Sequence, residues 1–172
     1  VYYSAANAQG GADLFTLDRL PEAVAERLLA CGWTACRSPV ISPDGNTLAY
    51  ESVPQITSSQ VVQVLLLDLA SATVEALGDL SHENSQPRWS ATGKLAYYDQ
   101  TALAYVIYDP QTGNSLRLPN QTGQGGSWSP DGRYFVAAEI SFIPLNALNE
   151  TGISRLLRYD AQTGAAVNLS FS

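Results

Sequence analysis

The segment Ser42–Tyr50, with the sequence SPDGNTLAY, returns as Ser90–Tyr97, SATGKLAY, and again as Ser129–Val136, SPDGRYFV. The glycines of these three segments lie 48 and 39 residues apart. A second landmark follows each segment, an apolar run that ends in aspartate before a turn, and these aspartates are Asp68, Asp109 and Asp160. Because two different landmarks alternate in step, the sequence predicts a structural repeat.

Each repeat is predicted to form four short strands. Proline fixes a turn dihedral and glycine takes the positive φ of a hairpin turn, so the Pro-Asp-Gly segments separate the first strand from the second. The following strands are rich in aromatic and β-branched residues, and a Thr-Gly hairpin leads into the fourth. The repeat length is that of a propeller blade. We therefore expect an all-β propeller segment of antiparallel blades, three complete (37–80, 85–118 and 123–169) and one incomplete (1–30).

One segment, Pro21–Ala30, can be read in two ways. Proline at a first helical position and acidic residues in the first turn favour a helix. In the register of the repeat, however, Val24–Leu29 falls where a fourth strand belongs. We expect the strand.

The repeat resembles the TolB-like, WD-type β-propeller repeat (PD40-like), in which an aromatic residue precedes Ser-Pro-Asp-Gly. Trp89–Gly93 and Trp128–Gly132 carry the resemblance, together with Pro87, and it covers about residues 37–169. Ile41 replaces the aromatic residue in the first unit, and Ala-Thr replaces Pro-Asp in the second. The resemblance implies a disc around a channel that serves as a binding platform, commonly with six or seven blades.

With three complete units and a sequence that begins without methionine, we expect an arc from a larger propeller. Unpaired strands and apolar blade faces at its ends would favour association, including self-association through the open blade edges.

Composition excludes several classes of protein. The 172 residues include 9 Lys and Arg against 16 Asp and Glu, a net charge of -7, which disfavours binding to nucleic acid. No apolar stretch approaches the roughly 20 residues that span a bilayer, so we expect no membrane insertion in this segment. No basic, apolar signal region opens the chain.

The sequence carries no recognisable catalytic motif, and we expect neither an enzyme nor a cofactor. His82 is the only histidine, and no Gly-x-Ser-x-Gly elbow is present. The glycine-rich stretch 123–126 lacks the lysine of a phosphate loop. Asp44 and Asp131 stand in Pro-Asp-Gly turns, where capping of the backbone is the expected role.

Cys31 and Cys36 enclose four residues and fit a small disulfide loop better than a zinc site, which needs two further ligands. Free thiols and redox chemistry are the alternatives. A disulfide implies an oxidising, extracytoplasmic compartment, whether periplasmic, cell-surface or secreted.

Candidate binding residues lie in the connections after second and fourth strands, which share one face of a propeller. Trp33 lies inside the cysteine loop, and His82, Glu83 and Asn84 lie in a connection that is either a solvated loop or a ligand contact. The longest connection, 140–154, contains an apolar run that would either plug a blade end or present its large side chains to a partner; these are Phe142, Ile143 and Leu145. Trp89 and Trp128, which recur at one repeat position, are expected to pack between blades.

These observations predict a non-catalytic extracytoplasmic binding or scaffold module that recognises a protein, peptide or glycan with the loops of one propeller face. A substrate-gating propeller domain of a larger serine hydrolase, resembling the prolyl-oligopeptidase relatives, is the alternative. A propeller enzyme that uses a metal in its channel is a third, weaker hypothesis.

Overall fold

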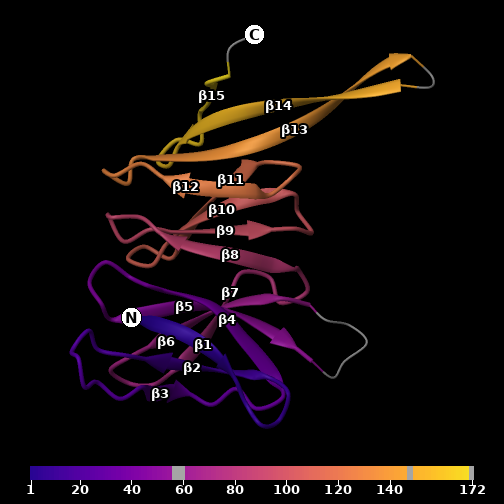
Figure 1. The fold of residues 1–172 in the computed structure, drawn as a ribbon. Helices are drawn as coiled ribbons and strands as arrows, with labels where there is room; N and C mark the ends of the chain where they lie inside the picture. The colour runs from indigo at the N-terminus through magenta and orange to yellow at the C-terminus, as the bar shows by residue number, and fades with distance from the viewer. Residues whose placement is uncertain (56–60, 147–148, 171–172) are drawn as a thin grey trace.

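The computed structural model describes residues 1–55, 61–146 and 149–170 (Figure 1). For residues 141–146 and 149–153 it describes the backbone only. All regular structure in the described residues is β-strand. The strands are β1 (Tyr2–Ala6), β2 (Ala12–Thr16), β3 (Glu26–Leu29), β4 (Thr34–Ile41), β5 (Thr47–Pro54), β6 (Gln63–Asp68), β7 (Val74–Leu77), β8 (Asn84–Trp89), β9 (Leu95–Asp99), β10 (Ala104–Asp109), β11 (Asn114–Pro119), β12 (Gln124–Trp128), β13 (Tyr134–Asn146), β14 (Asn149–Asp160) and β15 (Ala166–Asn168).

The strands form four successive blades of a β-propeller, stacked along the chain in Figure 1. Blade 1 comprises β1–β3, blade 2 β4–β7, blade 3 β8–β11 and blade 4 β12–β15, and neighbouring strands within each blade are antiparallel. One parallel pair, Ala12 with Ala35, joins blades 1 and 2. The predicted strand in Val24–Leu29 is confirmed as β3, so the helical alternative is wrong.

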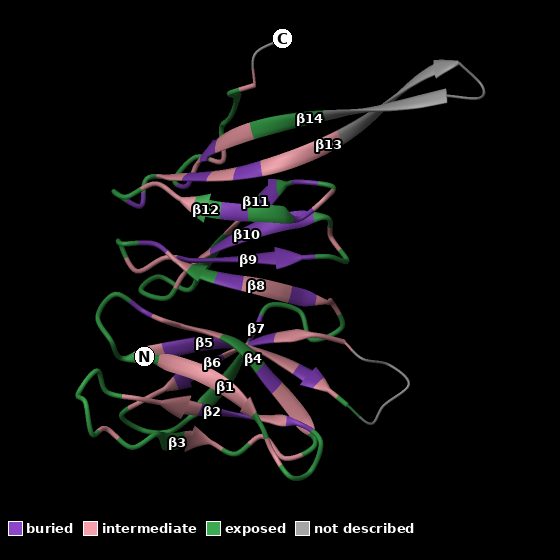
Figure 2. Cartoon of the chain, in the orientation of Figure 1, coloured by how far each residue is buried: buried purple, intermediate pink, exposed green. Residues whose placement is uncertain are grey.

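The hydrophobic core lies between consecutive blades, in three separate layers. Leu14 of blade 1 packs with Leu48 and Tyr50 of blade 2, and equivalent layers join blades 2 and 3 and blades 3 and 4. Figure 2 shows the buried residues concentrated in middle strands such as β9 and β10, whereas the outermost strands β7 and β15 are largely exposed. Each blade is therefore stabilised mainly by its neighbours.

Two tryptophans each join the inner, first strand of a blade to the first strand of the blade before it. Trp89 Nε1 in β8 donates a hydrogen bond to the carbonyl of Val40 in β4, at 3.2 Å, and Trp128 Nε1 in β12 donates to the carbonyl of Arg88 in β8, at 2.8 Å. Both rings also pack against the core layers. The predicted packing between blades is confirmed, and we call each contact an indole clasp. Ile41 holds the same position in blade 2 and has no side-chain donor.

The Trp128→Phe variant is expected to lose about 1 kcal/mol of unfolding free energy, because an aromatic ring remains but the hydrogen bond to Arg88 does not. Urea denaturation monitored by circular dichroism measures the change. Trp33→Phe is the matched control, since the Trp33 side chain is exposed and donates no hydrogen bond to the described residues. Equal losses in the two variants would contradict the role given to the clasp.

The Pro-Asp-Gly turns confirm the capping role predicted for their aspartates. Asp44 accepts a hydrogen bond from the main-chain N–H of Asn46 at 3.1 Å, and Asp131 accepts one from Arg133 at 3.0 Å. A hydroxyl donor, Ser42 in the first turn, is the main cause that lowers the pKa of the Asp44 carboxyl. These carboxylates therefore stabilise the turns.

Antiparallel pairing places alternate connections on opposite faces of the stack. The turn face holds the β4–β5, β8–β9 and β12–β13 turns, and the loop face holds the β3–β4, β5–β6 and β7–β8 connections. The predicted loop over 140–154 is wrong, because β13 and β14 continue as a paired hairpin as far as Asn146 and Asn149. This pairing satisfies the backbone N–H and C=O groups of the segment, and its aromatic and β-branched residues favour the strand conformation.

Candidate functional site

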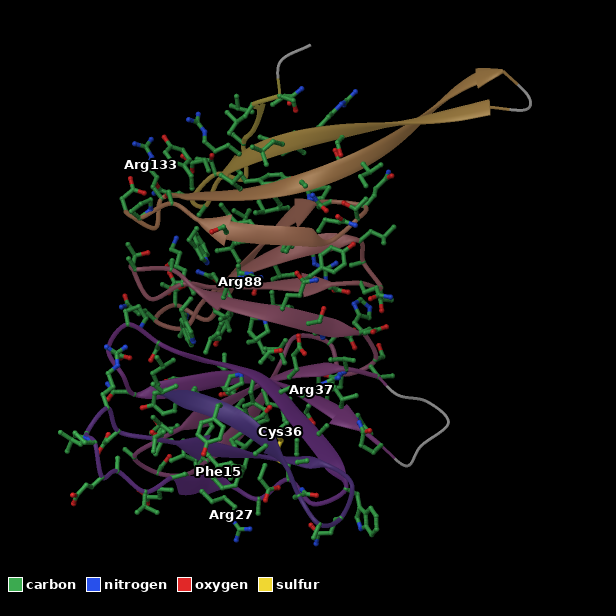
Figure 3. The ribbon with its side chains drawn as sticks, viewed as in Figure 1. Phe15, Arg27, Cys36, Arg37, Arg88 and Arg133 are labelled. Carbon is green, nitrogen blue, oxygen red and sulfur yellow. A yellow bond between two sulfur atoms is a disulfide. The ribbon has the colours of Figure 1, made fainter. Side chains whose placement is uncertain are left out.

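The predicted disulfide between Cys31 and Cys36 is present, with the sulfur atoms 2.01 Å apart. It closes the connection between β3 and β4 on the loop face. Cys36, labelled in Figure 3, is buried, whereas 60% of Trp33 is exposed. The bridge thus anchors a loop that carries a large aromatic side chain into solvent.

A buried carboxylate, that of Asp13, also holds the backbone of the disulfide loop. Asp13 in β2 accepts hydrogen bonds from the Asn7 side-chain amide at 2.7 Å and from the Cys31 main-chain N–H at 2.9 Å, and the Asn7 amide also donates to the Gly32 carbonyl at 2.8 Å. These donors, led by Asn7, lower the pKa of Asp13. Sequence reasoning missed both residues, because they lie in the incomplete blade, outside the recognisable repeat.

His82 lies in the β7–β8 connection, also on the loop face. Its Nδ1 is 2.8 Å from the buried carboxylate of Asp99, and its Nε2 is 3.8 Å from Asp79. The adjacent Glu83 is held by its backbone, which donates to the Thr101 hydroxyl at 3.0 Å. The His82 side chain remains 23% exposed, so part of it is accessible to a ligand.

Asn84 does not belong to an accessible site, which corrects the sequence prediction. It is 1% exposed, and its amide nitrogen donates to the carbonyls of Asp79 at 3.2 Å and His82 at 3.4 Å. The Asn84 side chain is therefore enclosed by the turn that precedes β8, where its amide adds to the hydrogen bonds of that turn.

The structure places Trp33 and His82 beside opposite ends of one connection, the link between β5 and β6. Gln55, at its start, donates its main-chain N–H to the Trp33 carbonyl at 3.3 Å, and Gln63, at its end, donates to the His82 carbonyl at 2.8 Å. The backbones of Phe142, Ile143 and Leu145 lie in β13, but their side chains are outside the described part of the chain. Of the predicted binding residues, the loop face therefore presents Trp33, His82 and Glu83.

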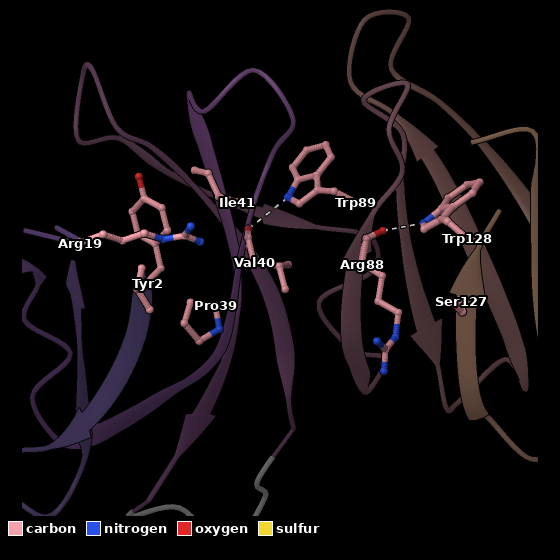
Figure 4. Close-up of a pocket in the computed structure, with 10 residues that line it drawn as sticks. Tyr2, Arg19, Pro39, Val40, Ile41, Arg88, Trp89, Ser127 and Trp128 are labelled. Carbon is pink, nitrogen blue, oxygen red and sulfur yellow. Dashed lines mark hydrogen bonds between the residues drawn. The ribbon is translucent and has the colours of Figure 1, made fainter. Parts of the chain in front are cut away.

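A second candidate site is a cleft of about 810 Å³ bounded by β1 and the inner strands β4, β8 and β12, near the turn face (Figure 4). Its lining includes Tyr2, Arg19, Val40, Arg88, Ser127 and Trp128. Neither arginine forms an ion pair with a carboxylate of the described residues. The sequence held a signal for this cleft: Val40, Arg88 and Ser127 each stand immediately before the aromatic position of a repeat.

Within residues 1–55, 61–146 and 149–170, no three His, Cys, Asp or Glu side chains gather in a way that could hold a metal ion. In the same ranges, no helix has the length and hydropathy needed to cross a membrane.

Comparison with solved structures gives the fold. TolB from Acinetobacter baumannii matches with a TM-score of 0.65 and 21% identity over 97% of this chain and 39% of TolB. The β-propeller domain of the trilobed protease from Pyrococcus furiosus matches with a TM-score of 0.67 and 13% identity, over 98% and 53% of the two chains. Dipeptidyl peptidase 4 from Porphyromonas gingivalis matches with a TM-score of 0.61 and 12% identity, over 99% and 31%.

The present chain thus spans less than two thirds of each of these three structures. No protein-family model matches it, and no curated protein sequence does.

Proposed function

We propose that this chain, which has the fold of the TolB-like β-propellers, is a non-catalytic binding module that recognises a protein, peptide or glycan partner with its loop face. The observation that carries the proposal is the exposed Trp33 on the disulfide-closed loop. Tryptophan is enriched among the few residues that dominate binding energy in protein interfaces.

The loop is ordered before any partner arrives. The disulfide closes it, and Asp13 and Asn7 bind its backbone at Cys31 and Gly32. Binding through a preorganised loop avoids much of the entropic cost of fixing side chains and backbone on association. His82 and Glu83, beyond the β5–β6 connection, extend the same face and give it polar groups.

An extracytoplasmic location belongs to the same proposal. Disulfides persist in oxidising compartments and are rare in the cytosol. The Cys31–Cys36 bridge supports a periplasmic, cell-surface or secreted protein.

The Trp33→Ala variant is expected to reduce recovery of the partner at least tenfold from cross-linked cells of the native host, because an interface anchor is removed. Val24→Ala is the matched control: Val24 is 87% exposed and lies between β2 and β3, on the turn face. Quantitative mass spectrometry compares the two variants with the parent, and the melting temperature confirms folding. Equal recovery with Trp33→Ala and the parent would remove the support for the loop face.

A gating domain of a larger hydrolase is the second candidate function. The likeness to dipeptidyl peptidase 4 and to a puromycin-hydrolysing peptidase of Mycobacterium tuberculosis supports it. The reading frame around this sequence distinguishes the two functions. A Gly-x-Ser-x-Gly elbow downstream would select the gating domain.

A further inference from the structure

Two adjoining cavities form a groove between blades 2 and 3 on the turn face, which we call the interblade groove. Their volumes are about 300 and 270 Å³, and both are lined by Thr47, Trp89 and Pro110. The first cavity has mostly uncharged walls, whereas the lining of the second includes Asp68 and Glu75. All of the lining residues belong to blades 2 and 3, each of which has its four strands. The groove therefore lies wholly between two complete blades.

The groove has an aromatic wall that is ordered without a ligand. Trp89 Nε1 donates its hydrogen bond to the Val40 carbonyl, as Figure 4 shows, and this bond fixes the orientation of the ring. Trp89 is only partly buried, and Tyr108 adds a second aromatic side chain to the second cavity. Because the faces of aromatic rings attract cations, these walls favour a positively charged ligand.

The carboxylates of the second cavity have no cation of this chain beside them. Asp68 Oδ1 accepts hydrogen bonds from the main-chain N–H groups of Ala70 and Ser71, at 3.0 and 2.7 Å. The Ser71 N–H is the main cause that lowers the pKa of Asp68, which is therefore ionised at neutral pH. The described residues include all nine lysines and arginines, and none of these forms an ion pair with Asp68 or Glu75.

The next blade closes the corresponding position with an apolar side chain. By strand register, Glu75 in β7 corresponds to Leu116 in β11. Leu116 packs against the core layer between blades 3 and 4, whereas Glu75 is exposed. A charged side chain thus stands in blade 2 where blade 3 has a side chain that fills the interface.

Blade 4 shows what its own turn places beside the landmark aspartate. Arg133, which holds the position of Asn46 in blade 2, has its Nε 3.7 Å from Asp160, the counterpart of Asp68. The same guanidinium lies 5.0 Å from the centre of the Tyr134 ring. Blade 4 therefore combines a carboxylate, a guanidinium and an aromatic ring, and blade 2 has the carboxylate and the ring without the guanidinium.

We propose that the interblade groove binds an arginine side chain of a partner protein, with the guanidinium stacked on Trp89 and paired with Asp68 and Glu75. A guanidinium is planar, stacks on aromatic rings and pairs with carboxylates, so it matches all three groups. The net charge of -7 favours a basic partner. The first cavity, with its mostly uncharged walls, accepts an apolar residue next to that arginine.

The interblade groove is on the turn face and does not involve Trp33. The proposal therefore goes beyond the loop-face function, and a failure of one leaves the other standing.

The test is a titration with the peptide acetyl-Gly-Leu-Arg-Gly-amide, followed by the NMR signal of the Trp89 indole N–H. This signal is identified by its absence from the spectrum of Trp89→Phe. The peptide should shift the signal to saturation. The same peptide with citrulline in place of arginine should bind about tenfold more weakly, because citrulline keeps the shape of the side chain and has no charge.

Glu75→Gln should weaken binding of the arginine peptide about fivefold, because one carboxylate of the groove is lost. Glu75 is exposed, so the variant should fold, and circular dichroism checks this. Glu22→Gln is the matched control: Glu22 is exposed between β2 and β3, and this variant has the same net charge as Glu75→Gln. It should bind as the parent does.

Equal binding of the arginine and citrulline peptides would overturn the proposal, as would an unshifted Trp89 signal or equal binding by the parent and Glu75→Gln. Argininamide tests the other source of the same chemistry. If it binds as tightly as the peptide, the occupant is a small guanidinium compound, and the assignment to a partner protein is wrong.

Discussion

Replacing Gly11 by alanine is expected to lower the free energy of unfolding by about 3 kcal/mol, near the upper end for overpacking of a buried site. Gly11 is buried where the β1–β2 turn meets the disulfide loop, and an added Cβ would overlap the carbonyl oxygens of Gly32 and Thr34. Both are backbone atoms of a loop closed by the Cys31–Cys36 bridge, so they cannot move aside as a flexible side chain could.

The neighbouring glycine gives a matched control for this variant. Gly10 has a φ of +92°, and an added Cβ there would meet nothing within 4 Å. Gly10→Ala should therefore cost only about 1 kcal/mol, from backbone strain alone. Urea denaturation of both variants distinguishes the cost of the steric overlap at Gly11 from the cost of backbone strain at Gly10. A Gly11→Ala protein as stable as the Gly10→Ala protein would contradict the close packing of the β1–β2 turn against the disulfide loop.

Removal of the disulfide has the second largest expected effect. The Cys31→Ala, Cys36→Ala double variant should lose about 2 kcal/mol, the loop-closure value for a ring of a few residues. Because the same bridge orders the loop that presents Trp33, partner recovery should fall as well. The parent protein in dithiothreitol should melt at the same temperature as the double variant. If the parent without reductant also melts at that temperature, the bridge contributes nothing to stability.

The repeat made most of the fold predictable. The Ser-Pro-Asp-Gly turns and the landmark aspartates placed the strands of blades 2 to 4, and they placed β3 against the helical propensity of Pro21–Ala30. The aspartates also revealed their own role, because an Asp two residues after a serine in a tight turn has main-chain donors within reach.

Other features depend on contacts that no local pattern encodes. The repeat predicts a loop for residues 140–154 of the third complete unit, but these residues extend the paired strands β13 and β14. The repeat places Asn84 in a connection between a fourth strand and the next first strand, which predicts an accessible side chain, yet this side chain is buried and hydrogen-bonds the preceding turn. The network of Asn7, Asp13 and Cys31 joins residues up to 24 positions apart and could not be read from spacing.

The indole clasps give the stack of blades a direction. In both, the donor belongs to the later blade, Trp89 or Trp128, and the acceptor carbonyl to the blade synthesised before it, at Val40 or Arg88. On the ribosome, each acceptor strand therefore emerges before its donor. Because domains fold from the N-terminus as they are made, every new blade meets a finished surface that already carries its attachment point, and the chain can assemble vectorially, one blade at a time.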